Sequence, residues 1–200
     1  GVSYEQVIKD AQDLGYAEAD PAADVEGMDA ADKIAILSGL AFGGAIQRES
    51  IPIQGISNLK NLDVDYATEL GYKVKLLAVA EIVDTQNSSN NSTPLALWVK
   101  PTLVPHDHPL SGVNGVNNAI LVKGEPIGEV MFYGPGAGAG ATASAVVADI
   151  LNIAGIHSMG NRSTGLDPLL SASSWRNCHV VDPKEIVHKN YLRIKTEDTP

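Results

Sequence analysis

The sequence predicts an α+β fold, in which a mixed or antiparallel sheet has helices packed on one face. Two observations predict it. Runs rich in strand-forming residues gather in the middle of the chain, at 72–84, 94–104 and 116–134, while helical patterns lie at both ends. The chain has 200 residues, of which 44% are hydrophobic, so one compact domain with a real core and a tail is expected.

Three helices are predicted before the strands, over 3–14, about 25–45 and 63–70. Ser3 is a suitable N-cap for the first helix, and Gly15 ends it. The second helix becomes almost purely apolar after Lys33, in the run IAILSGLAFGGAI. Such a helix is expected to be buried on most sides.

The strands at 72–84 and 94–104 flank a polar stretch, TQNSSNNST, which reads as the tip of a long hairpin. The next two strands, VNNAILVKG and PIGEVMFYG, are joined by a short turn at Gly124 to Pro126. A helix, TASAVVADILNIA, comes next. Residues 156–189 are rich in turn residues and read as a connector, and from Tyr191 the pattern alternates like a strand.

Charge and composition exclude several classes of function. The net charge of −10 argues against binding to nucleic acid, which needs a basic face, and against an anionic membrane surface. No apolar run is long enough to span a bilayer, and no signal peptide is visible. The single cysteine, Cys178, has no partner for an internal disulfide and is expected to pack as a small apolar residue. These features predict a cytoplasmic protein.

Two motifs resemble ligand-binding patterns, one for a metal ion and one for a dinucleotide, but their surroundings in the sequence favour neither site. His106 and His108 form an HDH triplet between two prolines, but no third ligand lies nearby, so no metal site is predicted. The run GPGAGAGA contains Gly136, Gly138 and Ala141 in the spacing of a dinucleotide fingerprint, between a predicted strand and a helix. No βαβ pattern follows, so a complete Rossmann unit is not expected.

The stretch Gly15 to Lys33, GYAEADPAADVEGMDAADK, is the most informative part of the chain. It gathers acidic residues around a predicted helix start, and Asp29 and Lys33 form an i,i+4 pair. Asp24 would be the N-cap. Taken alone, these charges could be explained by an ordinary helix whose acidic first turn faces solvent. Because an apolar run follows, Lys33 is expected at the border of the core, where lost hydration and nearby carboxylates compete over its charge.

The motifs GYAEADP, DVEGMDAADK and AIL resemble the signature of homoserine dehydrogenase. Two later stretches resemble this family in the same order: VPHDHPLSGVNGVNNAILVKGEPIGEVMFYGPGAGAGATASAVVADI resembles its later catalytic region, and YLRIKTEDTP resembles the opening strand of an ACT domain. The resemblance implies an oxidoreductase that interconverts L-homoserine and L-aspartate 4-semialdehyde with NAD or NADP. That reaction belongs to threonine, methionine and isoleucine biosynthesis.

The resemblance also implies roles for individual residues. Lys33 would be the proton donor and acceptor at the substrate oxygen, and Asp24 would help to orient the lysine and the substrate. Glu18 and Asp29 would bind the substrate amino group. Gly15 would lie close to the nucleotide, and Gly138 would contact it from the start of the last helix. No residue of this chain is expected to bind a metal.

The resemblance divides the chain into a catalytic and dimerisation domain at 1–155, a linker at 156–189, and the start of a truncated ACT domain at 190–200. The family's nucleotide-binding domain is expected upstream, so the chain reads as part of a longer enzyme that forms a homodimer. A second hypothesis stays open, that the separated chain is a non-catalytic oligomerisation module. The two differ in whether Lys33, Glu18, Asp24 and Asp29 converge on one pocket.

Overall fold

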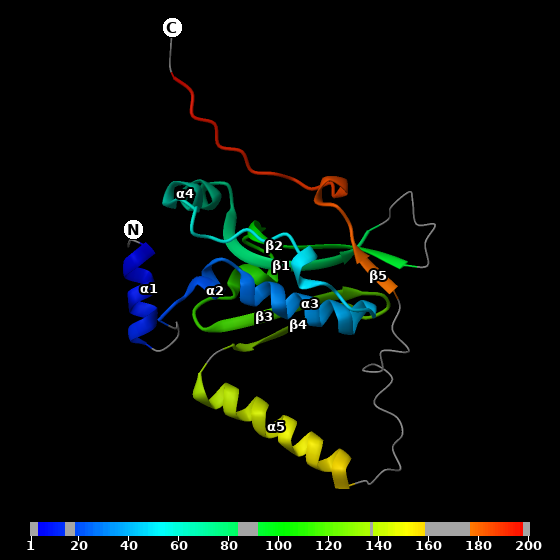
Figure 1. The fold of residues 1–200 in the computed structure, drawn as a ribbon. Helices are drawn as coiled ribbons and strands as arrows, with labels where there is room; N and C mark the ends of the chain where they lie inside the picture. Colours follow the sequence, from blue (N-terminus) through cyan, green and yellow to red (C-terminus); the bar gives the residue numbers. More distant parts are fainter. Residues whose placement is uncertain (1–3, 15–18, 84–91, 137, 159–176, 198–200) are drawn as a thin grey trace.

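The structure is a computed structural model that describes residues 4–14, 19–83, 92–136, 138–158 and 177–197. The predicted α+β class is confirmed, because the chain forms a mixed main sheet contacted by the helices α3 and α4, and a separate antiparallel hairpin (Figure 1). Within these ranges, no helix is both long enough and apolar enough to cross a membrane.

The main sheet has the strand order β1–β2–β5. β1 (Tyr72–Ile82) pairs antiparallel with β2 (Ser92–Pro105), and β5 (Asn177–Val180) pairs parallel with the first residues of β2. Farther along the same edge of β2, residues 52–54 take the place of β5. The Val99 N–H donates to the Pro52 carbonyl at 2.9 Å, and the Gln54 N–H donates to the Val99 carbonyl at 2.8 Å. β2 is therefore the central strand.

The core lies between β2 and the helix α3 (Met28–Phe42). Leu95, Leu97 and Val99 alternate along β2, so their side chains share one face of the sheet. Together with Ala31 of α3 and Ile51 they form a cluster in which every member is at most 4% exposed. This packing fixes α3 across the sheet.

The first half of the chain is helical, as predicted, in α1 (Tyr4–Asp13), α2 (Ala22–Val25), α3 and α4 (Asn61–Glu69). The helix predicted over about 25–45 is present as α3 but begins later, at Met28, because Gly27 adopts a left-handed φ of +79° and separates α2 from α3. Asp24 consequently lies inside α2 and is not the N-cap of the apolar helix. That position belongs to Gly27, without a side-chain cap. Ser3 and Gly15 lie outside the described residues.

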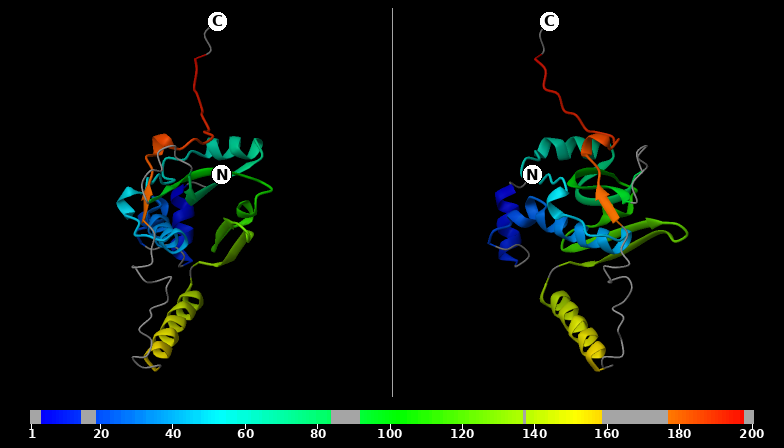
Figure 2. Two further views of the ribbon diagram at one scale, coloured as in Figure 1. Left: turned by 90° about the vertical axis from the view of Figure 1, so that its right-hand side faces the viewer. Right: turned by 45° about the vertical axis from the view of Figure 1, so that its right-hand side comes forward.

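The second sheet is the hairpin of β3 (Asn117–Gly124) and β4 (Gly128–Pro135), close to the two strands predicted there. The helix α5 (Ala139–Ser158) follows and projects away from the rest of the domain in all views (Figure 2). Its apolar residues are exposed along much of its length: Val146, Val147, Ile150, Leu151 and Ile153.

The C-terminal part differs from the sequence prediction in two ways. Residues 177–180, predicted as connector, form β5, and the Val181 N–H donates to the Leu95 carbonyl at 3.0 Å. This stretch is therefore part of the main sheet, and Cys178 packs half-buried against the core, as expected for a small apolar residue. After the 3₁₀ turn Pro183–Glu185, residues 187–197 form neither helix nor strand, so the strand predicted from Tyr191 is absent.

Candidate functional site

The candidate site lies around the turn between α2 and α3. Gly27 makes this turn possible in two ways: its left-handed φ suits glycine, and a Cβ atom there would lie 2.9 Å from Val99 Cγ1 on the central strand. The chain passes from Asp24 in α2 through this glycine to Asp29 in the first turn of α3. The acidic segment is thus seated directly on β2.

A second segment, residues 52–56, fastens the turn from the other side. The Ile56 N–H donates to the Val25 carbonyl at 2.9 Å, while Pro52 and Gln54 bond to β2. A Cβ on Gly55 would lie 2.6 Å from the Glu26 Cα atom, so this close approach of two backbones requires glycine. The position of the acidic turn is therefore set by backbone contacts.

Asp29 and Lys33 form an ion pair on α3, with 2.5 Å between Lys33 Nζ and Asp29 Oδ2. Their i,i+4 spacing puts both side chains on one face of the helix, as predicted. The Lys33 side chain is 63% exposed and that of Asp29 is 44% exposed. Ion pairs in such exposed positions stabilise a fold by about 1 kcal/mol at most. The pair is an accessible ammonium and carboxylate held at a defined place.

The expectation that Lys33 lies at the border of the core is wrong. The same face of α3 stays exposed in the following turns, where Ile36 is 66% and Leu40 is 45% exposed. The buried face of α3 carries Ala31 and Ser38 and lies on the opposite side. The apolar run that suggested burial on most sides is thus covered on one side and open on the side of Lys33.

The other predicted residues are placed as follows. Asp24 is exposed, and no hydrogen bond or ion pair joins it to Lys33 or Asp29, all three of which are described. Gly15 and Glu18 lie outside the described residues. The structure therefore brings together two of the predicted side chains, Asp29 and Lys33.

Gly138 lies exposed at the start of α5 with φ +112°, and no atom lies within 4 Å of where its Cβ would be. Its carbonyl accepts from the Thr142 N–H at 3.1 Å in the first turn of α5. The strand and the helix predicted on either side of the glycine run are present as β4 and α5, but β4 pairs antiparallel with β3, and the next described strand, β5, belongs to the main sheet. The glycine run opens no βαβ unit in the described part of the chain.

The histidine triplet stabilises a loop. His106 Nε2 donates to the Tyr72 carbonyl at 3.1 Å, and His108 Nδ1 accepts from the Leu110 N–H at 3.2 Å. Among the residues that the structure describes, no group of three or more His, Cys, Asp and Glu side chains could hold a metal ion.

Sequence reasoning missed the residues that seat the site. Gly27 carries a readable signal, since a glycine between two charged turns often ends a helix. Gly55 and residues 52–54 carry no such signal in the sequence. Their role depends on contacts with Val25, Glu26 and β2, which lie far from them along the chain.

Comparison with known proteins identifies the family. A family model described as homoserine dehydrogenase matches residues 1–151. The chain belongs to the homoserine dehydrogenase family. It is 50% identical over 200 residues to a homoserine dehydrogenase of Synechocystis. The aligned region covers 100% of this chain and 45% of that protein.

Solved structures of the homoserine dehydrogenase family agree with the fold. A crystal structure of a homoserine dehydrogenase from Thiobacillus denitrificans matches with a TM-score of 0.79 and 40% identity, over 90% of this chain and 40% of that chain. A hyperthermophilic archaeal homoserine dehydrogenase in complex with NADPH matches with a TM-score of 0.55 and 30% identity, over 76% and 40% of the two chains. The chain thus spans less than half the length of these relatives.

Proposed function

We propose that this chain is the substrate-binding catalytic domain of a homoserine dehydrogenase, which interconverts L-homoserine and L-aspartate 4-semialdehyde with NAD or NADP. The observation that carries the proposal is the exposed Asp29–Lys33 pair on α3, seated on the central strand by the turn at Gly27. Membership of the family supports it.

The chemistry assigns a role to each of these residues. Oxidation of a carbinol removes a hydride and a hydroxyl proton, and the nicotinamide, when bound, accepts the hydride. The Lys33 amine takes the hydroxyl proton in this direction, and its ammonium returns the proton in the reduction. The carboxylates of Asp29 and Glu18 bind the substrate ammonium, and Asp24 orients the lysine and the substrate.

The nucleotide contact within this chain is proposed at Gly138, with Gly15 as a second contact. Gly138 fits the role because it is exposed, lacks a side chain and has open space beside it, so a phosphate or ribose could approach its backbone closely. Most of the nucleotide site would belong to another part of the protein.

The open face of α3 supports this incomplete site. Lys33 shares that face with the exposed apolar side chains of Ile36 and Leu40, and a face of this kind is typical of an interface. The chain spans 45% of its Synechocystis relative, so we propose that a nucleotide-binding part of the whole protein covers this face.

The proposal is tested by homoserine-dependent formation of NAD(P)H in a protein that joins this chain to a family nucleotide-binding domain. General acid–base catalysis contributes about 10²- to 10⁴-fold, so Lys33→Met is expected to lose activity on that scale. Lys60→Met, which removes an exposed lysine at the start of α4, is the matched control and is expected to keep it. An active protein in which both variants are equally fast would refute the role of Lys33.

A second candidate function is a non-catalytic oligomerisation module, and the β3–β4 hairpin favours it. Its exposed large side chains include Ile120, Val122, Met131, Phe132 and Tyr133. We propose that this sheet forms a homodimer and that the 200-residue chain alone turns over no homoserine. Sedimentation equilibrium should give a dimer, and NAD(P)H formation by the chain alone would contradict the second statement.

A further inference from the structure

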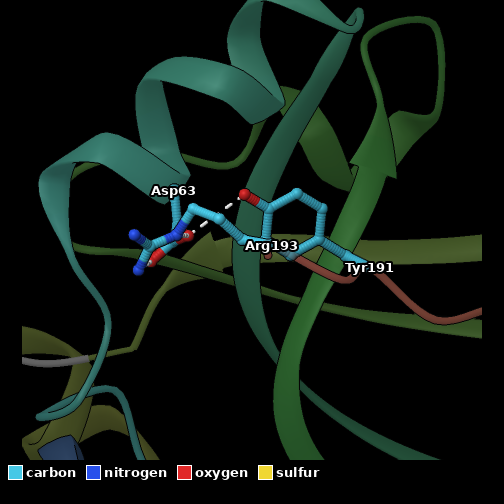
Figure 3. Close-up of polar contacts among 3 residues, drawn as sticks. All are labelled: Asp63, Tyr191 and Arg193. Carbon is cyan, nitrogen blue, oxygen red and sulfur yellow. Dashed lines mark hydrogen bonds and ion pairs between the residues drawn. The ribbon is translucent and has the colours of Figure 1, made fainter. Parts of the chain in front are cut away.

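The carboxylate of Asp63 on α4 binds two side chains of the C-terminal segment. It accepts from Arg193 Nε at 2.6 Å and from the second guanidinium nitrogen at 3.3 Å, and from the Tyr191 hydroxyl at 3.1 Å. Figure 3 shows Tyr191 and Arg193 converging on Asp63 from the same extended stretch. A carboxylate that accepts hydrogen bonds from two nitrogens of one guanidinium is held in a defined geometry.

The electrostatics agree with a strong local contact. The Asp63 side chain is 15% exposed and that of Arg193 is 32% exposed, far less than for the Asp29–Lys33 pair. The hydrogen bond from Arg193 lowers the pKa of the Asp63 carboxyl, and the same bond raises the pKa of Arg193. Burial, followed by the bond to Asp63, raises the pKa of the Tyr191 hydroxyl. Asp63 also lies in the first turn of α4, where the helix dipole favours an acid.

Little else holds this segment to the domain. Tyr191 and Arg193 point toward α4, whereas the alternate residues Leu192 and Ile194 are 80% and 78% exposed. In the described structure, residues 189–197 take part in no backbone hydrogen bond of a helix, sheet or turn. The bonds to Asp63 are therefore the polar contacts that join this extended stretch to the rest of the described domain.

We propose that Asp63, Tyr191 and Arg193 form a latch that holds the extended stretch 190–195 against the first turn of α4. α4 contacts β1 of the main sheet, so the latch ties the C-terminal end of the chain to the sheet that carries α3. Opening the latch frees this segment without disturbing the core, because its three members lie outside the buried cluster.

NMR relaxation of the ¹⁵N-labelled 200-residue chain tests the proposal. Hydrogen exchange would not, since these amides have no ladder bonds to protect them. The backbone order parameter of residues 190–195 is expected to be about 0.85 in the parent chain and below about 0.6 in Asp63→Asn. Asp65→Asn, two residues farther along the exposed side of α4, is the matched control and should leave the order parameter unchanged.

Arg193→Gln is the second variant, because it opens the latch from the other side and leaves α4 untouched. It should lower the same order parameters as Asp63→Asn, while the signals of β2 stay in place in both variants. Order parameters already below about 0.6 in the parent chain would overturn the latch, as would unchanged values in Arg193→Gln.

Discussion

Single residues decide how the acidic turn is placed on the sheet, and Gly27 is the clearest case. It combines a left-handed φ with a distance of 2.9 Å between the position of a Cβ and Val99 Cγ1. Gly27 thus sets where α3 begins on β2, and the i,i+4 spacing of Asp29 and Lys33 places both on the exposed side of the helix.

Gly27→Ala is expected to destabilise the chain by about 2–4 kcal/mol, because alanine pays the left-handed backbone penalty and meets Val99. Gly155→Ala in α5 is the control, since its φ is not positive and no atom lies within 4 Å of its Cβ position. There alanine should be neutral or stabilising, by up to about 1 kcal/mol. Urea unfolding of both variants measures the difference, and equal stabilities would contradict this account of Gly27.

Asp63 makes stability depend on pH at the acid end. Its pKa is lowered below the usual 3.8 by the hydrogen bond from Arg193. A lowered folded-state pKa gives stability that is fully present above the unfolded-state value and is lost as the pH falls through the folded-state value. The difference in free energy of unfolding between the parent chain and Asp63→Asn should thus be constant near neutral pH and shrink below pH 3.8. If this difference in free energy of unfolding stays independent of pH until the protein unfolds, Asp63 does not have a lowered pKa in the folded chain.

At the scale of elements, β2 organises the domain, because both of its edges and one face are covered. β1 lies on one edge, and β5 with residues 52–54 lies on the other. Its buried face carries Leu95, Leu97 and Val99 against α3. The site depends on β2 through these contacts.

Leu97→Ala is expected to cost about 2–5 kcal/mol, since Leu97 is fully buried and its truncation leaves a cavity beneath α3. Leu151→Ala, on the exposed face of α5, should change stability by less than about 0.5 kcal/mol. Chemical unfolding compares the two. Similar losses would show that the core is not centred on β2.

The lysines of β1 hold a neighbouring loop. Lys75 Nζ donates to the Val113 carbonyl and, at 3.1 Å, to Asn114 Oδ1, while Lys73 Nζ donates to the Ser111 carbonyl at 3.2 Å. Burial and the charge of Lys73 lower the pKa of Lys75, which reflects its place beneath this loop.

Lys75→Met should cost about 1 kcal/mol, because two acceptors of the loop lose their donor. Lys123→Met, which breaks only the exposed pair with Glu129, should cost less than about 0.5 kcal/mol. Thermal unfolding distinguishes them. A loss in Lys123→Met as large as in Lys75→Met would reject the anchoring role.

Patterns within a segment were predictable, and contacts between distant segments were not. The runs of strand-forming residues at 72–84 and 94–104 predicted β1 and β2, and the i,i+4 spacing predicted the Asp29–Lys33 pair. The four residues of β5 are too short for a periodic signal and form a strand because the edge of β2 is available. The bond between Asp63 and Arg193 joins residues 130 positions apart, and no local pattern indicates it.

At the scale of the whole molecule, one side of α3 is buried and several other elements carry exposed apolar residues. The buried cluster holds α3 on β2, the face with Lys33 stays accessible, and α5 and the β3–β4 hairpin present further exposed apolar residues. Exposed apolar surfaces of this extent are typical of a part of a larger assembly. This arrangement agrees with a chain that spans 45% of its Synechocystis relative.

The most direct test of the account is Lys33→Arg in the protein that joins this chain to a family nucleotide-binding domain. Arginine keeps the charge and can still pair with Asp29, but it does not release its proton at usable pH. Homoserine-dependent NAD(P)H formation should therefore fall by about 10²- to 10⁴-fold while the protein stays folded. Activity within a few-fold of the parent would contradict the claim that Lys33 moves the proton, and would reduce its role to that of a positive charge.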